Sequence, residues 1–224
     1  MKPPDGHWKF SCSGDVFAEL RQDREFTFLV AISRITNALK FGMAAMNDQG
    51  QESTPRADRQ RMNAFLYVAG ALHETFVFLE RAECEAGQTA YIAVKRVLEA
   101  AMSDPAIAQP LAAIRNRTAF HFDPSIAGRV LPTFPAESFS FATGIGGRRL
   151  DISNELSDIV TFTFLFGSIS DLPTMAAKFE HVRKTVYDLA ATVVETLDDV
   201  TFSRLRQRGF RFDAVSPEQA EDIE

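Results

Sequence analysis

The chain has few of the residues that hold small secreted or metal-bound proteins together. Among its 224 residues there are only two cysteines, Cys12 and Cys84, and neither has a second cysteine or a histidine at metal-ligand spacing. We therefore expect neither a disulfide framework nor a metal site. Nothing in the sequence calls for a cofactor, and the scarcity of cysteine fits a reducing cytoplasm.

Long hydrophobic runs are also missing. Residues 1–8 are polar and rich in proline, so they do not resemble a signal peptide. The longest apolar passage, around Ile159 to Gly167, is interrupted by threonines and is far shorter than the roughly 20 residues needed to cross a bilayer. We predict a buried helix there and no association with a membrane.

An excess of positive charge is absent as well. The formal net charge is -6, which argues against a protein whose whole surface binds nucleic acid. A local basic site is still compatible with this balance. One segment near the C-terminus is rich in arginine and contains Arg204, Arg206, Arg208 and Arg211. It could contact nucleic acid, although basic residues at the C-terminal end of a helix are also favourable by themselves.

Apolar residues recur with helical periodicity through most of the chain. Steps of three and four predict a first long helix over about 15–46 and a second that begins at Thr54-Pro55, where proline suits the first helical position. Gly87 is the expected end of the second helix. The most regular pattern begins at Pro173 and predicts one long helix to about Phe202.

Prolines divide the middle of the chain. Thr89 is the expected cap of a third helix, which should end before Asp104-Pro105, because a residue that precedes proline is pushed out of the helical region. Pro110 then fits the first turn of a short helix from Leu111 to about Phe120. Another helix is expected from about Asn154 to Phe166.

The pattern changes between these last two helices. Residues 138–142 and 148–152 alternate in polarity on either side of a glycine-rich turn, which predicts a β-hairpin at about 138–152. The turn lacks the lysine and serine that end a P-loop. We interpret it as a plain hairpin inserted into a helical protein.

Together these elements predict an all-α fold. Four to five long helices, each with one apolar face, can bury those faces by packing as an up-and-down bundle. We expect a single helical-bundle domain over 1–224, with flexible tails at 1–12 and 214–224. The twenty phenylalanines are expected mainly in its core.

One short segment combines groups suited to chemistry on phosphate. It reads Arg115-Asn116-Arg117-Thr118-Ala119-Phe120-His121 and precedes Asp123-Pro124. Histidine can transfer protons near neutral pH, and arginine can bind phosphate oxygens through its planar guanidinium group. Cleavage of RNA needs a base, an acid and a cation, none of which must be a metal. Arg115 and His121 are therefore the catalytic candidates.

Helix geometry limits how these two side chains can meet. Residues six apart lie about 120° from one another on an ideal helix, whereas Arg117 and His121, four apart, share a face. Arg115 and His121 could converge if the helix unwinds before Pro124. They could also converge if two subunits pair, so that His121 of one chain faces Arg115 of the other.

This motif resembles that of the HEPN superfamily, whose ribonuclease members carry arginine, often a polar residue, and histidine after four to six residues. The resemblance implies an all-α bundle that forms a homodimer and cleaves RNA without metal at a cleft between the subunits, often as a toxin or in defence against phage. It implies catalytic roles for Arg115 and His121 and an RNA-binding role for Asn116. We expect Arg117 to bind RNA as well. A protein partner that neutralises a toxin is a further expectation.

Two other functions are compatible with the same residues. His121 also suits a cap at a helix C-terminus, where positive charge meets the negative end of the helix dipole. The chain would then be a non-catalytic helical interaction or binding module of the same fold. A small-molecule-binding bundle would instead need a cavity lined by phenylalanine. No role is assigned to His7, His73 or His181.

Overall fold

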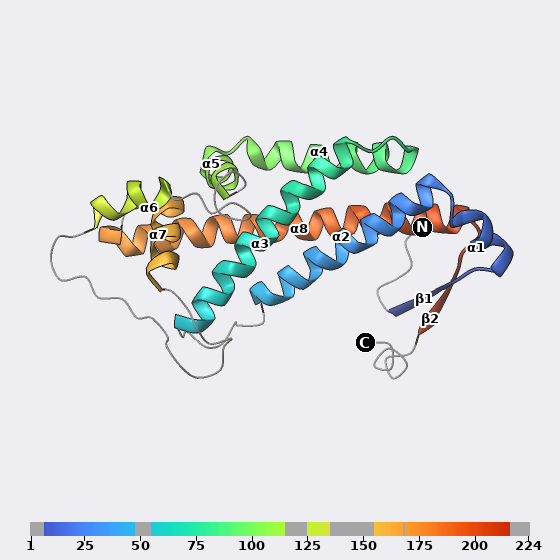
Figure 1. Cartoon of the computed structure of the whole chain (residues 1–224), viewed down its shortest axis with the longest axis horizontal. Helices are drawn as coiled ribbons and strands as arrows, with labels where there is room; N and C mark the ends of the chain where they lie inside the picture. Colours follow the sequence, from blue (N-terminus) through green and yellow to red (C-terminus); the bar gives the residue numbers. More distant parts are fainter. Residues whose placement is uncertain (1–6, 48–54, 115–124, 135–154, 168, 216–224) are drawn as a thin grey trace. The chain divides into compact units, whose positions relative to one another are not determined.

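The computed structural model describes residues 7–47, 55–114, 125–134, 155–167 and 169–215 (Figure 1). Within these ranges the chain is all-α with one small antiparallel pair of strands, which confirms the predicted fold class. In chain order the elements are β1 His7–Ser11, α1 Gly14–Leu20, α2 Arg24–Asn47, α3 Pro55–Glu80, α4 Glu85–Met102, α5 Pro105–Ala113, α6 Ser125–Val130, η2 Leu131–Thr133, α7 Glu155–Phe166, η4 Ile169–Asp171, α8 Leu172–Gln207 and β2 Arg211–Val215.

The structure divides into two compact units, each built from separate stretches of the sequence. The first unit comprises Met1–Lys40, Glu74–Leu98 and Ala191–Glu224, and the second comprises Phe41–His73 and Glu99–Ala190. Helices α2, α3, α4 and α8 each contribute residues to both units. The prediction of one domain over 1–224 stays a prediction.

The first predicted helix, over about 15–46, is interrupted in the structure. Helix α1 ends at Leu20 and α2 begins at Arg24. The break follows from Asp23, because its carboxylate accepts a hydrogen bond of 2.8 Å from the backbone N–H of Phe26 and so caps the first turn of α2. Apolar residues lie on both sides of the break, but residues 21–25 between them are all polar, so the periodicity does not bridge the two helices.

Gly87 and Thr89 do not have the end and start roles expected of them. Helix α3 ends earlier, at Glu80, and both residues lie inside α4. The Thr89 hydroxyl donates a 2.9 Å hydrogen bond to the Glu85 carbonyl within the helix. Gly87 is a close-packing position, since a Cβ there would overlap the side chain of Ala82 and lie 2.9 Å from Phe28. Glycine is thus required by contact and not by a helix end.

The expected break at Asp104-Pro105 is confirmed, but the helix after it begins sooner than predicted. Asp104 caps α5 by accepting a 2.8 Å hydrogen bond from the backbone N–H of Ala106, and Pro105 occupies the first helical position. Pro110 consequently lies inside α5 and does not begin a helix at Leu111. The later starts, α7 at Glu155 and α8 at Leu172, agree with prediction.

The two described strands come from opposite ends of the chain. Strands β1 and β2 pair antiparallel, with Phe10 opposite Phe212 (Figure 1). The ring of Phe10 lies 4.9 Å from that of Phe212 and 5.2 Å from that of Phe202, measured between centroids. Residues 7–11 and 214–215, predicted to belong to flexible tails, are therefore in a sheet. The hairpin predicted at about 138–152 lies outside the described residues.

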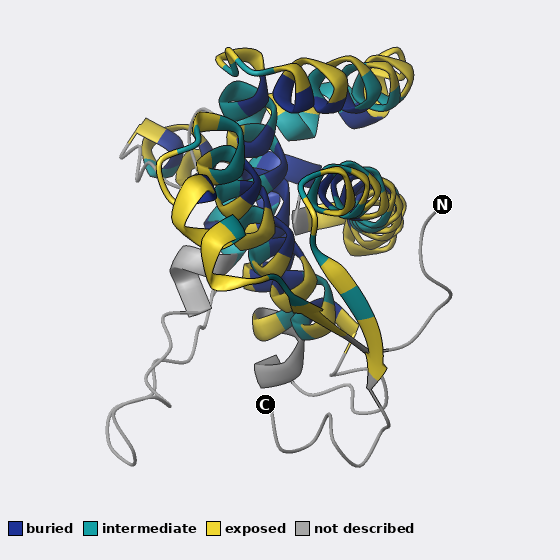
Figure 2. Cartoon of the chain, turned by 90° about the vertical axis from the view of Figure 1, so that its right-hand side faces the viewer, coloured by how far each residue is buried: buried dark blue, intermediate teal, exposed yellow. Residues whose placement is uncertain are grey.

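Each unit has an apolar core formed by the inner faces of its helices, which Figure 2 shows as dark blue surfaces opposite exposed yellow ones. In the second unit four phenylalanine rings gather, with centroids 4.9–6.1 Å apart: Phe65, Phe162, Phe166 and Phe179. Phe65 is completely buried. In the first unit the buried side chains include Leu29, Ile32, Leu79, Val94, Val193 and Leu197. Most of the apolar stripes predicted from the sequence therefore lie in these cores, although Ile92 of α4 is 52% exposed.

Two described helical segments are long and apolar enough to cross a membrane when only length and composition are considered. They are Arg24–Asn47 and Gln60–Glu80, and 33% and 50% of their most apolar windows are buried within the protein. The core helices of proteins without membrane spans often have the same composition. Packing accounts for part of this apolar character, since Leu29 and Phe65 are buried.

Candidate functional site

The predicted catalytic and RNA-binding residues, Arg115, His121, Asn116 and Arg117, lie outside the described residues. Helix α5 is the element that leads to them, since its last residue is Ala113 and its C-terminal cap is Ile114. Ile114 is completely buried and Ile107 is nearly so. The helix before the motif is therefore anchored in the core of the second unit, with the motif next in sequence.

The arginine-rich segment near the C-terminus is largely occupied by ion pairs in the first unit. Arg208 donates to Asp23 at 3.0 Å and to Glu25 at 2.8 Å. Arg204 donates to Glu85 at 2.8 Å and lies 3.6 Å from Glu25. We call these five side chains the ion-pair cluster. Since Arg204 and Arg208 are already matched by carboxylates, they are poorly suited to bind phosphate as well.

Two carboxylates of this cluster, Asp23 and Glu85, are stabilised in their charged form. The pKa of Asp23 lies below its usual value, first because the backbone N–H of Phe26 donates to the carboxylate and further because Arg208 is close. The hydrogen bond from Arg204 similarly lowers the pKa of Glu85. The Glu25 side chain is only 14% exposed and lies 2.8 Å from Arg208 and 3.6 Å from Arg204. The cluster joins the starts of α2 and α4 to the end of α8.

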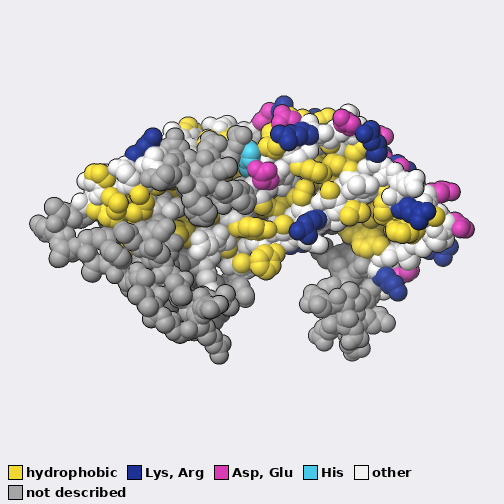
Figure 3. Space-filling view, viewed as in Figure 1, with side chains coloured by type: hydrophobic (Ala, Val, Ile, Leu, Met, Phe, Trp, Pro, Cys, Tyr) yellow, Lys and Arg dark blue, Asp and Glu magenta, His cyan; other side chains and the backbone are white. Residues whose placement is uncertain are grey.

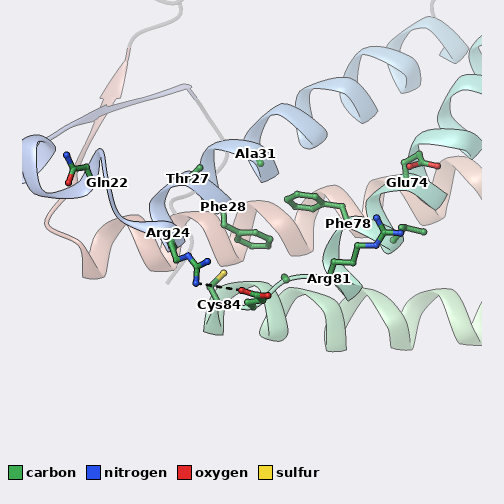
Figure 4. Close-up of a pocket in the computed structure, with 12 residues that line it drawn as sticks. Gln22, Arg24, Thr27, Phe28, Ala31, Glu74, Phe78, Arg81 and Cys84 are labelled. Atoms are coloured by element: carbon green, nitrogen blue, oxygen red, sulfur yellow. Dashed lines mark ion pairs between the residues drawn. The ribbon is translucent and has the colours of Figure 1, made fainter.

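A groove of about 610 Å³ opens beside the cluster, between α2 and the last turns of α3 (Figure 4). Phe28 and Phe78 line its apolar wall, with parallel rings whose centroids are 5.3 Å apart. Arg24 and Arg81 also line it, and Arg24 lies 3.7 Å from Glu83 in an exposed ion pair. The groove offers an aromatic wall and mixed charge, but it brings together no pair of groups arranged for proton transfer.

A second cavity, of about 460 Å³, lies in the second unit between α5, α7 and the first turns of α8. Its wall is apolar on the α7 side, where Phe164 and Phe166 line it. Three polar side chains face it from two helices, namely Gln109 of α5 and Lys178 and His181 of α8. Lys178 and His181 are three residues apart and so share a helix face. Ala113, at the end of α5, also lines this cavity.

Each basic group of this cavity has an identifiable neighbour. The Nε2 atom of His181 lies 3.8 Å from the carboxylate of Asp104, whose other oxygen caps α5. The ammonium group of Lys178 lies 3.8 Å from the position that a Cβ at Gly167 would occupy, at the C-terminal end of α7. A cation there faces the negative end of a helix dipole. His181, to which the sequence assigned no role, thus has a carboxylate partner that sequence spacing could not reveal.

Elsewhere on the described surface, charges of both signs are mixed. On the face shown in Figure 3, Lys and Arg side chains are interspersed with Asp and Glu. Within the described ranges no group of three histidine, cysteine, aspartate or glutamate side chains could hold a metal ion. Cys12 and Cys84 are both free thiols. In the cavity of the second unit, Lys178 and His181 line open space together with Gln109.

Comparison with known proteins does not assign the chain to a family. No family model matches it, and neither the curated proteins nor the solved structures give a match. The functional argument therefore rests on the residues of this chain.

Proposed function

We propose that the protein is a metal-independent endoribonuclease of the HEPN type that acts as a homodimer. The observation that carries the proposal is the motif Arg115-Asn116-Arg117-Thr118-Ala119-Phe120-His121, which directly follows a core-anchored helix in an all-α protein. The two free cysteines are compatible with a reducing cytoplasm, where RNA is the abundant substrate. A toxin or phage-defence role, restrained by a neutralising protein, belongs to the same proposal.

The chemistry assigns a distinct task to each residue. In the proposed reaction a histidine removes the proton of the ribose 2'-hydroxyl, and the resulting oxygen attacks the adjacent phosphorus while the bond to the 5'-oxygen breaks. A second histidine, protonated, donates a proton to that leaving oxygen. Arg115 stabilises the negative charge that develops on the phosphorane oxygens. The products are a 2',3'-cyclic phosphate and a 5'-hydroxyl end.

A dimer supplies the second histidine that a single motif lacks. A base and an acid require two histidines, and two copies of the chain bring two copies of His121. A two-fold axis through a shared cleft also allows Arg115 of one chain to approach His121 of the other, which a single straight helix disfavours at about 120° of separation. Asn116 and Arg117 would bind the RNA strand that enters the cleft.

The direct test is RNA cleavage by the purified protein in EDTA. Arg115→Ala and His121→Ala should each reduce the cleavage rate by at least about 100-fold, the usual contribution of a general acid or base or of a charge-stabilising group. Arg129→Ala is the matched control, because Arg129 is an exposed arginine of α6 outside the motif. Helical content should be measured by circular dichroism for every variant. Equal rates in the wild type and both motif variants, or no cleavage by the wild type, would reject the proposal.

A non-catalytic interaction module is the second candidate, and one observation favours it. Phe41 is 72% exposed and Leu172 is 55% exposed, although both are large apolar side chains. Exposed groups of this kind are common at protein interfaces. Self-association of the protein without any cleavage of RNA would support this candidate over the enzyme.

A further inference from the structure

The cavity of the second unit has the composition of a site for an anion. Lys178 supplies an ammonium group, His181 a ring N–H donor, and Gln109 an amide N–H donor from the opposite helix. All three side chains line one space of about 460 Å³. A cation and two further donors that converge from two helices can surround the oxygens of one phosphate group.

The nearby carboxylates do not cancel this preference. Asp104 is engaged in capping α5 through one oxygen and faces His181 with the other. The Thr174 hydroxyl and, at 3.2 Å, the Thr174 backbone N–H donate to Asp171 and lower its pKa, as does the charge of Lys178 to a smaller degree. Neither aspartate lines the cavity. The His181–Asp104 separation of 3.8 Å is also longer than the hydrogen bonds of 2.8–3.0 Å that join the arginines of the ion-pair cluster to their carboxylates.

The position of the cavity along the chain identifies the source of the phosphate. Ala113 lines the cavity, and the motif begins two residues later in the sequence, outside the described residues. We infer that this cavity is a subsite for a backbone phosphate of the RNA strand, held by Lys178 and His181 with help from Gln109. The inference rests on the proposed ribonuclease function and adds a binding site to it.

The test measures how RNA binding depends on salt. The probe is a short fluorescent RNA with 2'-O-methyl riboses, which cannot be cleaved, and binding is followed by anisotropy at several salt concentrations. Each phosphate neutralised by a cation on a single strand contributes roughly 0.7 to the slope of log affinity against log salt. Lys178→Gln should therefore reduce the magnitude of this slope by roughly 0.7 and weaken binding for all sequences alike.

Lys184→Gln is the matched control. It removes the same charge from an exposed position of the same helix, away from the cavity, so its slope should equal that of the wild type. His181→Gln and Gln109→Ala should weaken binding at fixed salt. If Lys178→Gln behaves like Lys184→Gln, or if the wild type does not bind the RNA, the subsite is rejected.

Inorganic phosphate provides a second probe, observed through the nuclear magnetic resonance signals of the His181 ring. Perturbation by both phosphate and RNA supports the subsite, whereas perturbation by phosphate alone shows a site for free phosphate and rejects the RNA strand. The outcome is separable from the ribonuclease proposal. If cleavage depends on His121 but Lys178→Gln leaves the salt dependence of RNA binding unchanged, only the subsite is rejected. If Lys178→Gln reduces that salt dependence but no RNA is cleaved, only the nuclease proposal is rejected.

Discussion

Helix α8 carries two groups of basic side chains that have different surroundings. In the first unit, Arg204 and Arg208 are matched by Asp23, Glu25 and Glu85 at distances of 2.8–3.6 Å. In the second unit, the basic groups of the same helix line a cavity of about 460 Å³. The comparison teaches that the number of arginines in a segment is a poor guide to anion binding. What matters is whether the fold places carboxylates or open space in front of them.

The largest expected effect comes from breaking the ion-pair cluster. Arg208→Met should lower the free energy of unfolding by about 2 kcal/mol, because it leaves the mostly buried Glu25 with only the longer contact to Arg204. Urea unfolding measures the change. Arg206→Met is the control, since Arg206 is exposed and takes no part in the cluster, and it should change stability by less than about 0.5 kcal/mol. Equal losses for both variants would show that the cluster contributes no stability.

The next effect concerns the wall of the cavity. Gly167 has a φ of 123°, which side chains rarely adopt, and a Cβ there would contact the ammonium of Lys178. Gly167→Ala should therefore destabilise the protein by about 1 kcal/mol or more. Gly128→Ala in α6 is the control, because a Cβ there meets nothing within 4 Å and alanine favours a helix. In thermal unfolding, Gly167→Ala should lower the melting temperature and Gly128→Ala should raise it. An unchanged melting temperature for Gly167→Ala would contradict the backbone argument.

The smallest expected effect is a dependence on pH. The pKa of Asp23 is lower in the folded protein than its ordinary value of 3.8, so its stabilising contribution is present above that value and is lost as the pH falls below it. The partly exposed setting limits this contribution to less than about 1 kcal/mol. Asp23→Asn should therefore be less stable than the wild type at pH 6, with the difference shrinking toward pH 3. Urea unfolding at both pH values measures it, and a constant difference would contradict the assignment.

The helices themselves were largely predictable from the sequence. The stripes that gave the long helix from Pro173 and the helix from about Asn154 to Phe166 are the buried faces of α8 and α7. Proline and its capping residue marked the break at Asp104-Pro105 correctly. These signals are local, since a period of 3.6 residues or a cap depends only on neighbours in the chain.

Two of the errors have one physical origin. Gly87 was expected to end a helix, yet its role is to allow α4 to approach Phe28 and Ala82, which depends on packing. Phe10 was expected in a tail, yet it pairs with Phe212 from the far end of the chain. Both cases require knowledge of which segments meet in the fold. The break at Asp23 differs, because its cap to Phe26 is local and lies in the polar stretch 21–25.

The sequence by itself determined that this protein is helical, which faces most of its helices bury, and that it carries the Arg115 and His121 motif on which the proposal of RNA cleavage rests. Those properties follow from residue type and short-range periodicity. Only the tertiary structure decided that Arg204 and Arg208 are matched by carboxylates and that Lys178 and His181 face a cavity. The reason is physical, because the partners of a charge are set by the three-dimensional approach of residues that lie up to 185 positions apart in the chain.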